Sequence, residues 1–256
     1  HQMNILKDKL RTKQLTIGSW MSLGYPAIAE IMAKAGFEWL VIDMEHSAIS
    51  MDQCQELVRI VDLCGISPLV RIGANDTLLI KRAMDAGSHG VIVPSVNSRE
   101  DAERAVSAVK YPPHGTRGVG LSRAQGYGES FNEYKKWVEE ESTIIVQIEH
   151  IKAVENLKQI LTVEGIDGFI VGPYDLSGSL GIPGDFEDKK MHEALAEIKK
   201  VAVEVNISAG YHVVPPQPEL AADKIKEGYS FIAYSVDFLF IGESCRSGIE
   251  EILSSI

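Results

Sequence analysis

Short apolar segments recur along the chain at regular intervals, and this repetition limits the fold more than any other feature of the sequence. Each segment is four to six residues long and nearly continuously apolar, which is typical of strands buried on both faces. The eight segments that fit this description are 16–20, 39–43, 67–71, 90–94, 144–148, 168–171, 207–212 and 231–235. They predict eight strands of a parallel sheet.

The stretches between these strands carry the periodicity of amphipathic helices. In 51–64 the apolar residues recur three and four positions apart, and Ser50 with Gln53 forms a capping box ahead of them. The same spacing predicts helices over 98–109 and 191–205. A strand followed by a helix, repeated along the chain, indicates a parallel sheet with helices covering it.

Eight strand–helix units in 256 residues predict an α/β protein with a (β/α)8 barrel. A doubly wound open sheet is the structural alternative, but the chain has no GxGxxG motif. No Pro/Ser-rich or charged linker divides the sequence, so we expect one domain over 1–256. We expect residues 1–3 to be the remnant of a tag, and a helix at about 237–254 to lie in an interface between subunits.

The composition excludes two classes of partner. Thirty-six Asp and Glu against 25 Lys and Arg give a net charge of −11, and no cluster of basic residues is present to neutralise a phosphate backbone. Nucleic acid is therefore excluded as a partner. No apolar run approaches the roughly 18 residues of a membrane-spanning helix, so we expect a cytoplasmic protein without a membrane partner. An anionic substrate would need positive charge gathered locally, from an arginine, a metal ion or a helix end.

Polar side chains follow five of the predicted strands at their carboxyl ends, where barrel enzymes carry their chemistry. Taken singly, each residue has an ordinary structural role; Arg71, for example, could simply neutralise Asp43. Polar residues at five strand ends together favour an active site over that interpretation. The residues concerned are Asp43, Glu45, His46, Arg71, Gln147, Glu149, Asp175 and His212.

Two of these carboxylates predict a metal site. Glu149 and Asp175 are hard oxygen ligands on neighbouring strand ends, with no Cys or His beside them to favour a softer ion. We expect Mg²⁺ or Mn²⁺, with Co²⁺ as a further candidate, and no organic cofactor. The carboxylate and keto oxygens of a 2-oxo acid would fill two positions on such an ion, and Arg71 would add positive charge where an enolate develops. His46 is the candidate base, because histidine titrates closest to neutral pH.

Two absences narrow the chemistry. No predicted strand contains a lysine, so the chain offers no candidate for a Schiff base inside the barrel. The ends of the last two strands lack the glycine-rich turns of a barrel phosphate site, which favours a carboxylate substrate over a phosphorylated one.

Four stretches of the sequence together resemble a known family. They are Phe37–His46, Tyr111–Gly120, Val146–Glu149 and Val163–Ser177. In this order they resemble the HpcH/HpaI family of metal-dependent class II pyruvate aldolases, which includes the 4-hydroxy-2-oxoheptanedioate and 2-dehydro-3-deoxyglucarate aldolases. The resemblance runs from about residue 15 to 238. It implies a barrel of the phosphoenolpyruvate/pyruvate-binding type, and an aldolase that reversibly cleaves a 4-hydroxy-2-oxo acid into pyruvate and an aldehyde.

The resemblance also implies a role for each matching residue. His46 would accept the proton, Arg71 would stabilise the transition state and bind substrate, and Asp85 would raise the basicity of His46. The implied metal ligands are Glu149 and Asp175. The implied substrate contacts are Arg71, Gln147, Tyr174 and Asp175. The family usually has Ala or Ser where this chain has Tyr174, so a Tyr174 ring turned inward would narrow the pocket.

The family resemblance implies a homo-oligomer, often a hexamer, and topology gives this a consequence. Asp85 ends a helix, and helices return to the barrel end opposite the catalytic rim. We therefore expect His46 to meet Asp85 of a neighbouring subunit. The long loop that carries Arg123 also follows a helix, and its residues either serve a neighbouring site or pack in an interface.

Three other functions are compatible with parts of the sequence. An oxaloacetate decarboxylase would use the same enolate chemistry. A CoA-thioester lyase is disfavoured because no basic cluster is present for the nucleotide phosphates. A non-catalytic barrel that binds a metabolite is disfavoured by the complete set of site residues.

Overall fold

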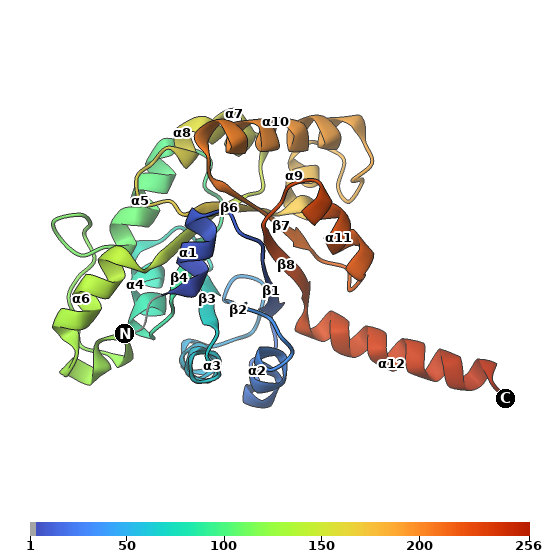
Figure 1. The fold of residues 1–256 in the computed structure, drawn as a ribbon, viewed down its shortest axis with the longest axis horizontal. Coiled ribbons are helices and arrows are strands. Elements are labelled where there is room, and N and C mark those ends of the chain that lie inside the picture. Colours follow the sequence, from blue (N-terminus) through green and yellow to red (C-terminus); the bar gives the residue numbers. More distant parts are fainter. Residues whose placement is uncertain (1–3) are drawn as a thin grey trace.

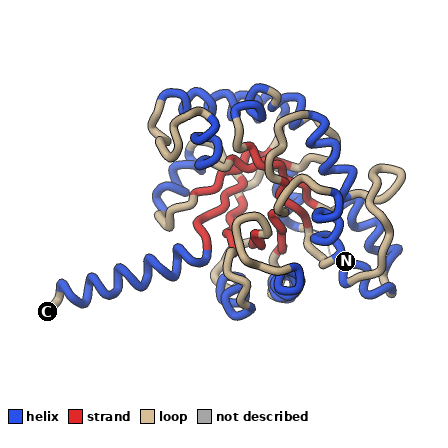
Figure 2. The backbone as a smooth tube through the Cα atoms, turned by 180° about the vertical axis from the view of Figure 1, so that it is seen from behind, coloured by secondary structure: helices blue, strands red, loops and turns tan. Residues whose placement is uncertain are grey.

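A closed barrel of eight parallel strands forms the centre of the protein (Figure 2). The computed structural model describes residues 4–256, so the prediction of a tag remnant at 1–3 lies outside the described residues. The predicted strands are confirmed to within one residue at each end. They are β1 (Thr16–Met21), β2 (Trp39–Asp43), β3 (Ser67–Arg71), β4 (Gly90–Val93), β5 (Thr143–Ile148), β6 (Gly168–Val171), β7 (Ser208–Val213) and β8 (Phe231–Val236).

Most of the helices surround the barrel on its outer face, whereas the first packs against one end of its interior and the last extends away from it (Figure 1). The helices are α1 (Ile5–Arg11), α2 (Pro26–Ala33), α3 (Met51–Leu63), α4 (Thr77–Asp85), α5 (Arg99–Val109), α6 (Phe131–Glu140), α7 (Ile151–Glu155), α8 (Leu157–Leu161), α9 (Pro173–Ser179), α10 (Lys189–Val205), α11 (Pro218–Lys226) and α12 (Asp237–Ser254). A 3₁₀ helix, η1 (Arg123–Gly128), lies in the long loop before α6. The three helices predicted from periodicity are confirmed, and Ser50 with Gln53 caps α3 as predicted.

Two apolar cores follow from the alternation of side chains along the strands. One fills the barrel, where the Trp39 and Phe231 rings stack with their centroids 4.2 Å apart, and where Leu6 and Leu10 of α1 pack against the inward side chains. The other lies between the strands and the surrounding helices. Since α1 contacts the amino-terminal half of the interior, the opposite end of the barrel is the end that stays open.

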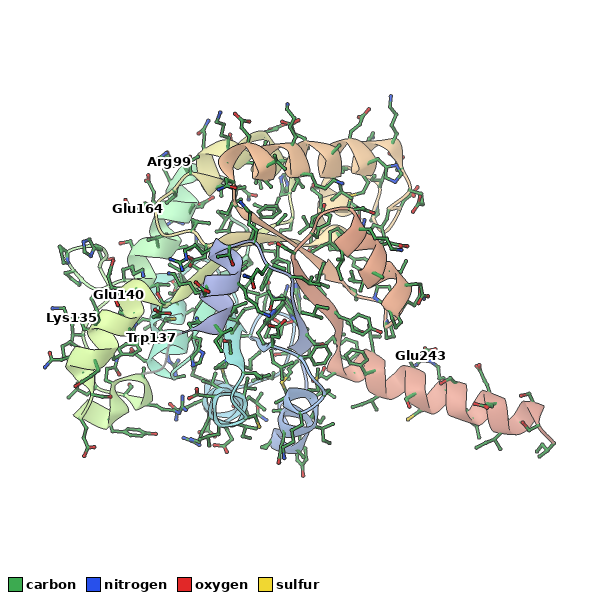
Figure 3. The ribbon with its side chains drawn as sticks, viewed as in Figure 1. Arg99, Lys135, Trp137, Glu140, Glu164 and Glu243 are labelled. Atoms are coloured by element: carbon green, nitrogen blue, oxygen red, sulfur yellow. The ribbon has the colours of Figure 1, made fainter. Side chains whose placement is uncertain are left out.

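Helix α12 extends away from the barrel (Figure 1). Its first turn packs against the barrel through Leu239 and Phe240, and Figure 3 shows Glu243, further along the helix, clear of the other elements. Asp237 is the one residue of this helix that is buried among those described. Five large apolar side chains of α12 are therefore exposed: Phe238, Ile241, Ile249, Ile252 and Leu253.

Among residues 4–256, no helix is both long enough and apolar enough to cross a membrane.

Candidate active site at the barrel mouth

Side chains alternate between the two faces of a strand, and this alternation places several of the predicted site residues on the inward face of the barrel. On β2, β3 and β5, the residues Val41, Leu69 and Ile145 face the barrel interior. The side chains two positions further along, Asp43, Arg71 and Gln147, share that orientation and are buried. They form the layer directly above the apolar interior, at the carboxyl ends of the strands.

Arg71 is the centre of this layer. It pairs with Asp43 in bidentate geometry, with Nε 3.0 Å from Oδ1 and Nη2 2.5 Å from Oδ2. Burial alone would raise the pKa of Asp43, but the hydrogen bonds and charge of Arg71 hold it below its ordinary value. The guanidinium also lies over the ring of Trp20, 5.1 Å from its centroid. Arg71 is thus fixed on one side by a carboxylate and on another by an indole.

A chain of hydrogen bonds runs from Arg71 to Glu149. Nη1 of Arg71 donates to Oε1 of Gln147 at 3.5 Å, and Nε2 of Gln147 donates to Oε2 of Glu149 at 2.7 Å. The backbone N–H of Ser95, a residue held at φ 54°, donates to Oε1 of Glu149 at 2.7 Å. A Cβ at Gly172 would lie 2.8 Å from Nε2 of Gln147, so a glycine is needed at the end of β6 for this approach.

The mouth carries more negative charge than Arg71 can neutralise. Burial raises the pKa of Glu149 to about 7, with Glu45 and Asp175 adding to the increase. Burial also raises the pKa of Glu45, to which Asp43 and Asp175 contribute in the same direction. Oε2 of Glu45 is buried without a hydrogen bond, although it lies 3.5 Å from Nη1 of Arg71. The mouth therefore holds four carboxylates and the single guanidinium of Arg71. The carboxylates are those of Asp43, Glu45, Glu149 and Asp175.

This arrangement fits a divalent cation. Glu149 is buried, whereas Asp175 is exposed in the first turn of α9, so the pair faces the mouth from two neighbouring strand ends. Two carboxylates with water and substrate in the remaining positions suit Mg²⁺ or Mn²⁺. Among residues 4–256, no group of three or more His, Cys, Asp or Glu side chains is placed to hold a metal ion. The fit rests on the two carboxylates and on the uncompensated charge around them.

His46 lies at the edge of the site. Its backbone N–H donates to Oδ1 of Asp43 at 3.2 Å, which fixes the turn after β2. Its side chain is 69% exposed, and its Nε2 lies 3.9 Å from Oε1 of Glu45. Nothing else in the described part of the chain fixes this ring.

Asp85 does not contact His46 within the chain. It ends α4, as predicted, and its Oδ1 pairs with Nη2 of the buried Arg117 at 2.5 Å and accepts from Nε2 of Gln125 at 3.4 Å. The absence of an intrachain contact agrees with the topological argument. The pairing with a neighbouring subunit stays a prediction, because one chain is described.

Arg123, the other residue of this region singled out in the sequence, has partners within its own chain. Its Nη2 lies 2.7 Å from Oδ2 of Asp62, and its Nη1 donates to the carbonyl of Ala86 at 3.2 Å.

Tyr174 packs against the segment between α9 and α10. Its ring meets Phe186 edge to face, with centroids 5.0 Å apart, and is half exposed. The ring is therefore not positioned to fill the space between Arg71 and Glu149, and the Tyr174 backbone N–H at the start of α9 stays available to a ligand.

Sequence reasoning gave no role to two residues of the site. Glu45 lies in the turn after β2, where its backbone N–H donates to Oδ1 of Asp43 at 2.9 Å, so the alternation along the strand does not extend to it. Trp20 supports Arg71 from β1, a strand separated from β3 by β2 in the barrel. No local pattern signals a contact of that kind.

A (β/α)8 barrel with an arginine and several carboxylates gathered at its open end has the arrangement of a barrel enzyme, because the active sites of such enzymes lie at that end. Comparison with known proteins gives the family. The chain belongs to the HpcH/HpaI aldolase/citrate lyase family, whose sequence model matches residues 16–242. It is a lyase of the aldolase kind.

Individual relatives cover nearly the whole chain. A pyruvate aldolase from Rhizobium etli is 38% identical over 246 residues, 96% of this chain and 96% of that protein. A 2-dehydro-3,6-dideoxy-6-sulfogluconate aldolase from Pseudomonas putida is 36% identical over 233 residues, 89% of each chain. A solved HpcH/HpaI aldolase/citrate lyase family protein from Burkholderia cenocepacia superposes with a TM-score of 0.93 at 30% identity, over 98% of this chain and 99% of that one.

Proposed function

We propose that the protein is a divalent-metal-dependent pyruvate aldolase that reversibly cleaves a 4-hydroxy-2-oxo acid into pyruvate and an aldehyde. The observation that carries this proposal is the buried chain from Asp43 through Arg71 and Gln147 to Glu149, with Asp175 beside it. The names of the relatives from Rhizobium etli and Pseudomonas putida support the same reaction class.

Glu149 and Asp175 would hold the cation. The cation would supply Lewis-acid stabilisation of negative charge on the keto oxygen of the substrate. Because Glu149 carries a pKa raised to about 7 by burial and neighbouring acids, a cation there would also compensate the charge that the described residues leave unbalanced.

Arg71 would stabilise the same oxygen from the protein side. Its guanidinium is held by Asp43 before substrate arrives, so no reorganisation is needed when an enolate forms. Gln147 would orient substrate through the amide group that already links Arg71 to Glu149. The backbone N–H of Tyr174 and the side chain of Asp175 would complete the contacts to the pyruvate part.

His46 would move the proton. In the synthetic direction it takes a proton from the methyl carbon of pyruvate, and the electron pair left behind forms the enolate. The enolate carbon then attacks the aldehyde carbonyl carbon, and the resulting alkoxide takes up a proton to give the 4-hydroxyl group. Cleavage reverses these steps, breaks the bond between carbons 3 and 4, and releases the aldehyde.

We further propose that the active site is shared within a homo-oligomer. The His46 ring is exposed and weakly held in its own chain, whereas Asp85 keeps Oδ2 free of hydrogen bonds to the described residues. Asp85 of a neighbouring subunit would orient the His46 ring and raise its basicity.

Exchange of the pyruvate methyl protons with D₂O, followed by NMR, tests the proposal. We expect exchange with Mg²⁺ or Mn²⁺ that stops in excess chelator and falls about 100-fold in Arg71→Lys, since lysine cannot reproduce the bidentate contact with Asp43. Arg104→Lys, an exposed arginine of α5, is the matched control and should exchange at the wild-type rate. Exchange that persists in chelator would remove the metal from the mechanism. Failure of the wild-type protein to exchange under any metal would overturn the proposed function.

A further inference from the structure

Arg117 is a buried cation that neither the proposed metal site nor the proposed proton transfer uses. It lies in the loop between α5 and η1, within Tyr111–Gly120, one of the four stretches that carry the family resemblance. The loop turns back on α5, where the backbone N–H of Arg117 donates to the carbonyl of Lys110 at 3.0 Å. A Cβ at Gly115 would lie 2.2 Å from the same carbonyl oxygen, so a glycine is needed for this turn.

Two aromatic rings hold the side chain of Arg117. Its guanidinium carbon lies 4.7 Å from the ring centroid of Tyr111 and 5.3 Å from the ring centroid of Tyr134. Nη1 of Arg117 also donates to the hydroxyl oxygen of Tyr134 at 2.9 Å. Because the guanidinium is planar, stacking and this hydrogen bond together fix the direction in which Nη2 points.

Nη2 of Arg117 points to Asp85, at the end of α4. It donates to Oδ1 of Asp85 at 2.5 Å, and Nε2 of the fully buried Gln125 donates to the same oxygen at 3.4 Å. Oδ2 of Asp85 has no hydrogen-bond partner among residues 4–256 and is accessible at the surface. The carboxylate is therefore fixed through one oxygen and presents the other outward.

This geometry differs from that of an ion pair that serves stability alone. A buried arginine is best compensated when both oxygens of its carboxylate are bonded, as in the pair of Arg71 with Asp43. Arg117 bonds one oxygen of Asp85 and leaves Oδ2 to a donor from outside the chain. The proposed shared site supplies that donor, because Asp85 would meet the His46 ring of a neighbouring subunit.

We propose that Arg117 is a positioning residue for the neighbouring active site: it holds Oδ1 of Asp85 so that Oδ2 faces the His46 ring of the next subunit. This inference rests on the proposed aldolase function and on the proposed shared site. Arg117 would touch neither the substrate nor the cation, and it would act on the neighbour's site, not on the mouth of its own chain. Its loss should therefore slow proton transfer without weakening the binding of pyruvate or metal.

Arg117→Lys keeps the buried charge but loses the planar group that is stacked and directed at Asp85. We expect it to lower kcat for exchange of the pyruvate methyl protons by about tenfold or more, since misplacing a catalytic group by about 1 Å can cost about 100-fold. The KM for pyruvate and the affinity for Mn²⁺, measured by electron paramagnetic resonance, should stay at wild-type values. Arg104→Lys makes the same exchange on an exposed arginine and should leave kcat unchanged.

Mixing subunits shows on which chain Arg117 acts. In a mixture with His46→Ala, an Arg117→Lys subunit has an intact mouth and receives an intact Asp85 and Arg117 from its partner. This mixture should recover about one quarter of wild-type activity, because one of the four combinations in random pairs is intact. A mixture of Arg117→Lys with Asp85→Asn should show only the mean of the two separate activities, because both defects lie on the same side of the interface.

Several outcomes would overturn the inference. Recovery with Asp85→Asn and none with His46→Ala would mean that Arg117 acts on its own mouth. A wild-type kcat in Arg117→Lys, or a loss of Mn²⁺ affinity as large as the loss of kcat, would leave Arg117 without a positioning role. If Arg117→Lys does not assemble in light scattering, Gln125→Leu takes its place in both mixtures, because Gln125 bonds the same oxygen of Asp85.

Failure of the inference can be distinguished from failure of the proposals on which it rests. If His46→Ala mixed with Asp85→Asn stays inactive while wild type exchanges the pyruvate protons, the shared site and this inference both fall and the aldolase function stands. If that mixture recovers activity and only the two Arg117→Lys mixtures depart from expectation, this inference alone falls. No exchange in wild type under any metal would overturn the function itself.

Discussion

Arg71 is held by contacts that serve stability and chemistry together. Its charge is buried, and a buried charge is tolerated when it is paired and hydrogen-bonded, as Asp43 achieves here. The same pairing fixes the direction of the guanidinium at the barrel mouth. A change to Asp43 should therefore affect both properties.

Asp43→Asn should lower the free energy of unfolding by about 3 kcal/mol, because it removes one partner of a buried ion pair. It should also slow metal-dependent exchange of the pyruvate protons, because an amide nitrogen then faces a guanidinium. Urea unfolding and NMR exchange measure the two effects. Asp62→Asn is the matched control: Asp62 pairs with Arg123, is one-third exposed, and lies away from the mouth. An equal loss of exchange in that variant would contradict the assignment.

His212 gives a prediction for the dependence of stability on pH. Its pKa is about 4 in the folded protein, against about 6.5 for an unperturbed histidine. The unfolded chain therefore binds more protons between these values, so stability is lost as the pH falls through that range. Between pH 7 and pH 5 we expect a loss of about 2 kcal/mol from this residue.

His212→Gln, in which the amide can still donate toward Ser235, should remove that contribution. The difference in unfolding free energy between wild type and variant, measured in urea at pH 7 and pH 5, should change by about 2 kcal/mol in favour of the variant at the lower pH. A constant difference would mean that the ring is not neutral and buried in the folded state.

Some of the site residues were predictable from the sequence and others were not, for a physical reason. Asp43, Arg71, Gln147 and Glu149 end buried strands, and the two-residue period fixes the face on which each lies. The contacts of Trp20 with Arg71 and with His212 depend on the order in which strands meet around the barrel. Contacts of that kind are set by closure and leave no signal in the neighbouring sequence.

At the scale of elements, the strands were predictable because each is continuously apolar, whereas η1 was not. Gly126, Tyr127 and Gly128 have φ values of 60°, 55° and 108°, so this turn follows no helical period. Its position depends on tertiary contacts, such as the hydrogen bond from Gln125 Nε2 to the hydroxyl of Tyr111 at 2.8 Å. Local spacing carries no information about such a segment.

Lys110 ties two elements together in a way that can be tested. It follows α5, is buried, and its Nζ donates to the carbonyls of Val138 and Glu139 at 2.6 and 2.7 Å, at the carboxyl end of α6. Burial lowers its pKa to about 8, so the amine stays largely charged at pH 7.

Lys110→Met should lower the free energy of unfolding by about 2 kcal/mol, because the last carbonyls of α6 lose charge-assisted hydrogen bonds. Urea unfolding measures the loss, and amide exchange should show earlier opening of α6. Lys158→Met removes an exposed lysine that pairs with Glu204 and should cost less than about 0.5 kcal/mol. Equal effects in the two variants would mean that Lys110 does not cap the helix.

At the scale of the whole molecule, the exposed apolar side chains of α12 favour an oligomer over a monomer. An exposed series of apolar side chains on one helix marks a contact surface. We expect Ile249→Glu with Leu253→Glu, both on exposed positions four residues apart, to convert the assembly into a smaller species in light scattering. Ser247→Glu, an exposed polar position on the same helix, should leave the mass unchanged. An unchanged mass in the double variant would exclude α12 from the interface.

The shared active site makes the sharpest prediction about the assembly. His46 and Asp85 do not contact each other within one chain. On a shared site, a subunit with a defective His46 can still supply an intact Asp85 to its neighbour, and the reverse also holds. His46→Ala and Asp85→Asn should each lower activity, and subunits of the two mixed at equal amounts should recover about one quarter of wild-type activity. This value follows from symmetry: half of random pairs are mixed, and one of the two sites in each mixed pair has both residues.

Mixing His46→Ala with Arg71→Lys provides the decisive control. Both of these residues lie beside Glu45 of the same chain, so every site in the mixture carries one defect and no activity should return. Recovery in this control would show that subunit mixing raises activity by another route. If mixed assemblies form, as followed by a tag on one variant, and the His46→Ala and Asp85→Asn mixture stays inactive, then Asp85 acts within its own chain. Its role would then be to pair with the buried Arg117, which stabilises the loop before α6 and leaves His46 to act without a carboxylate partner.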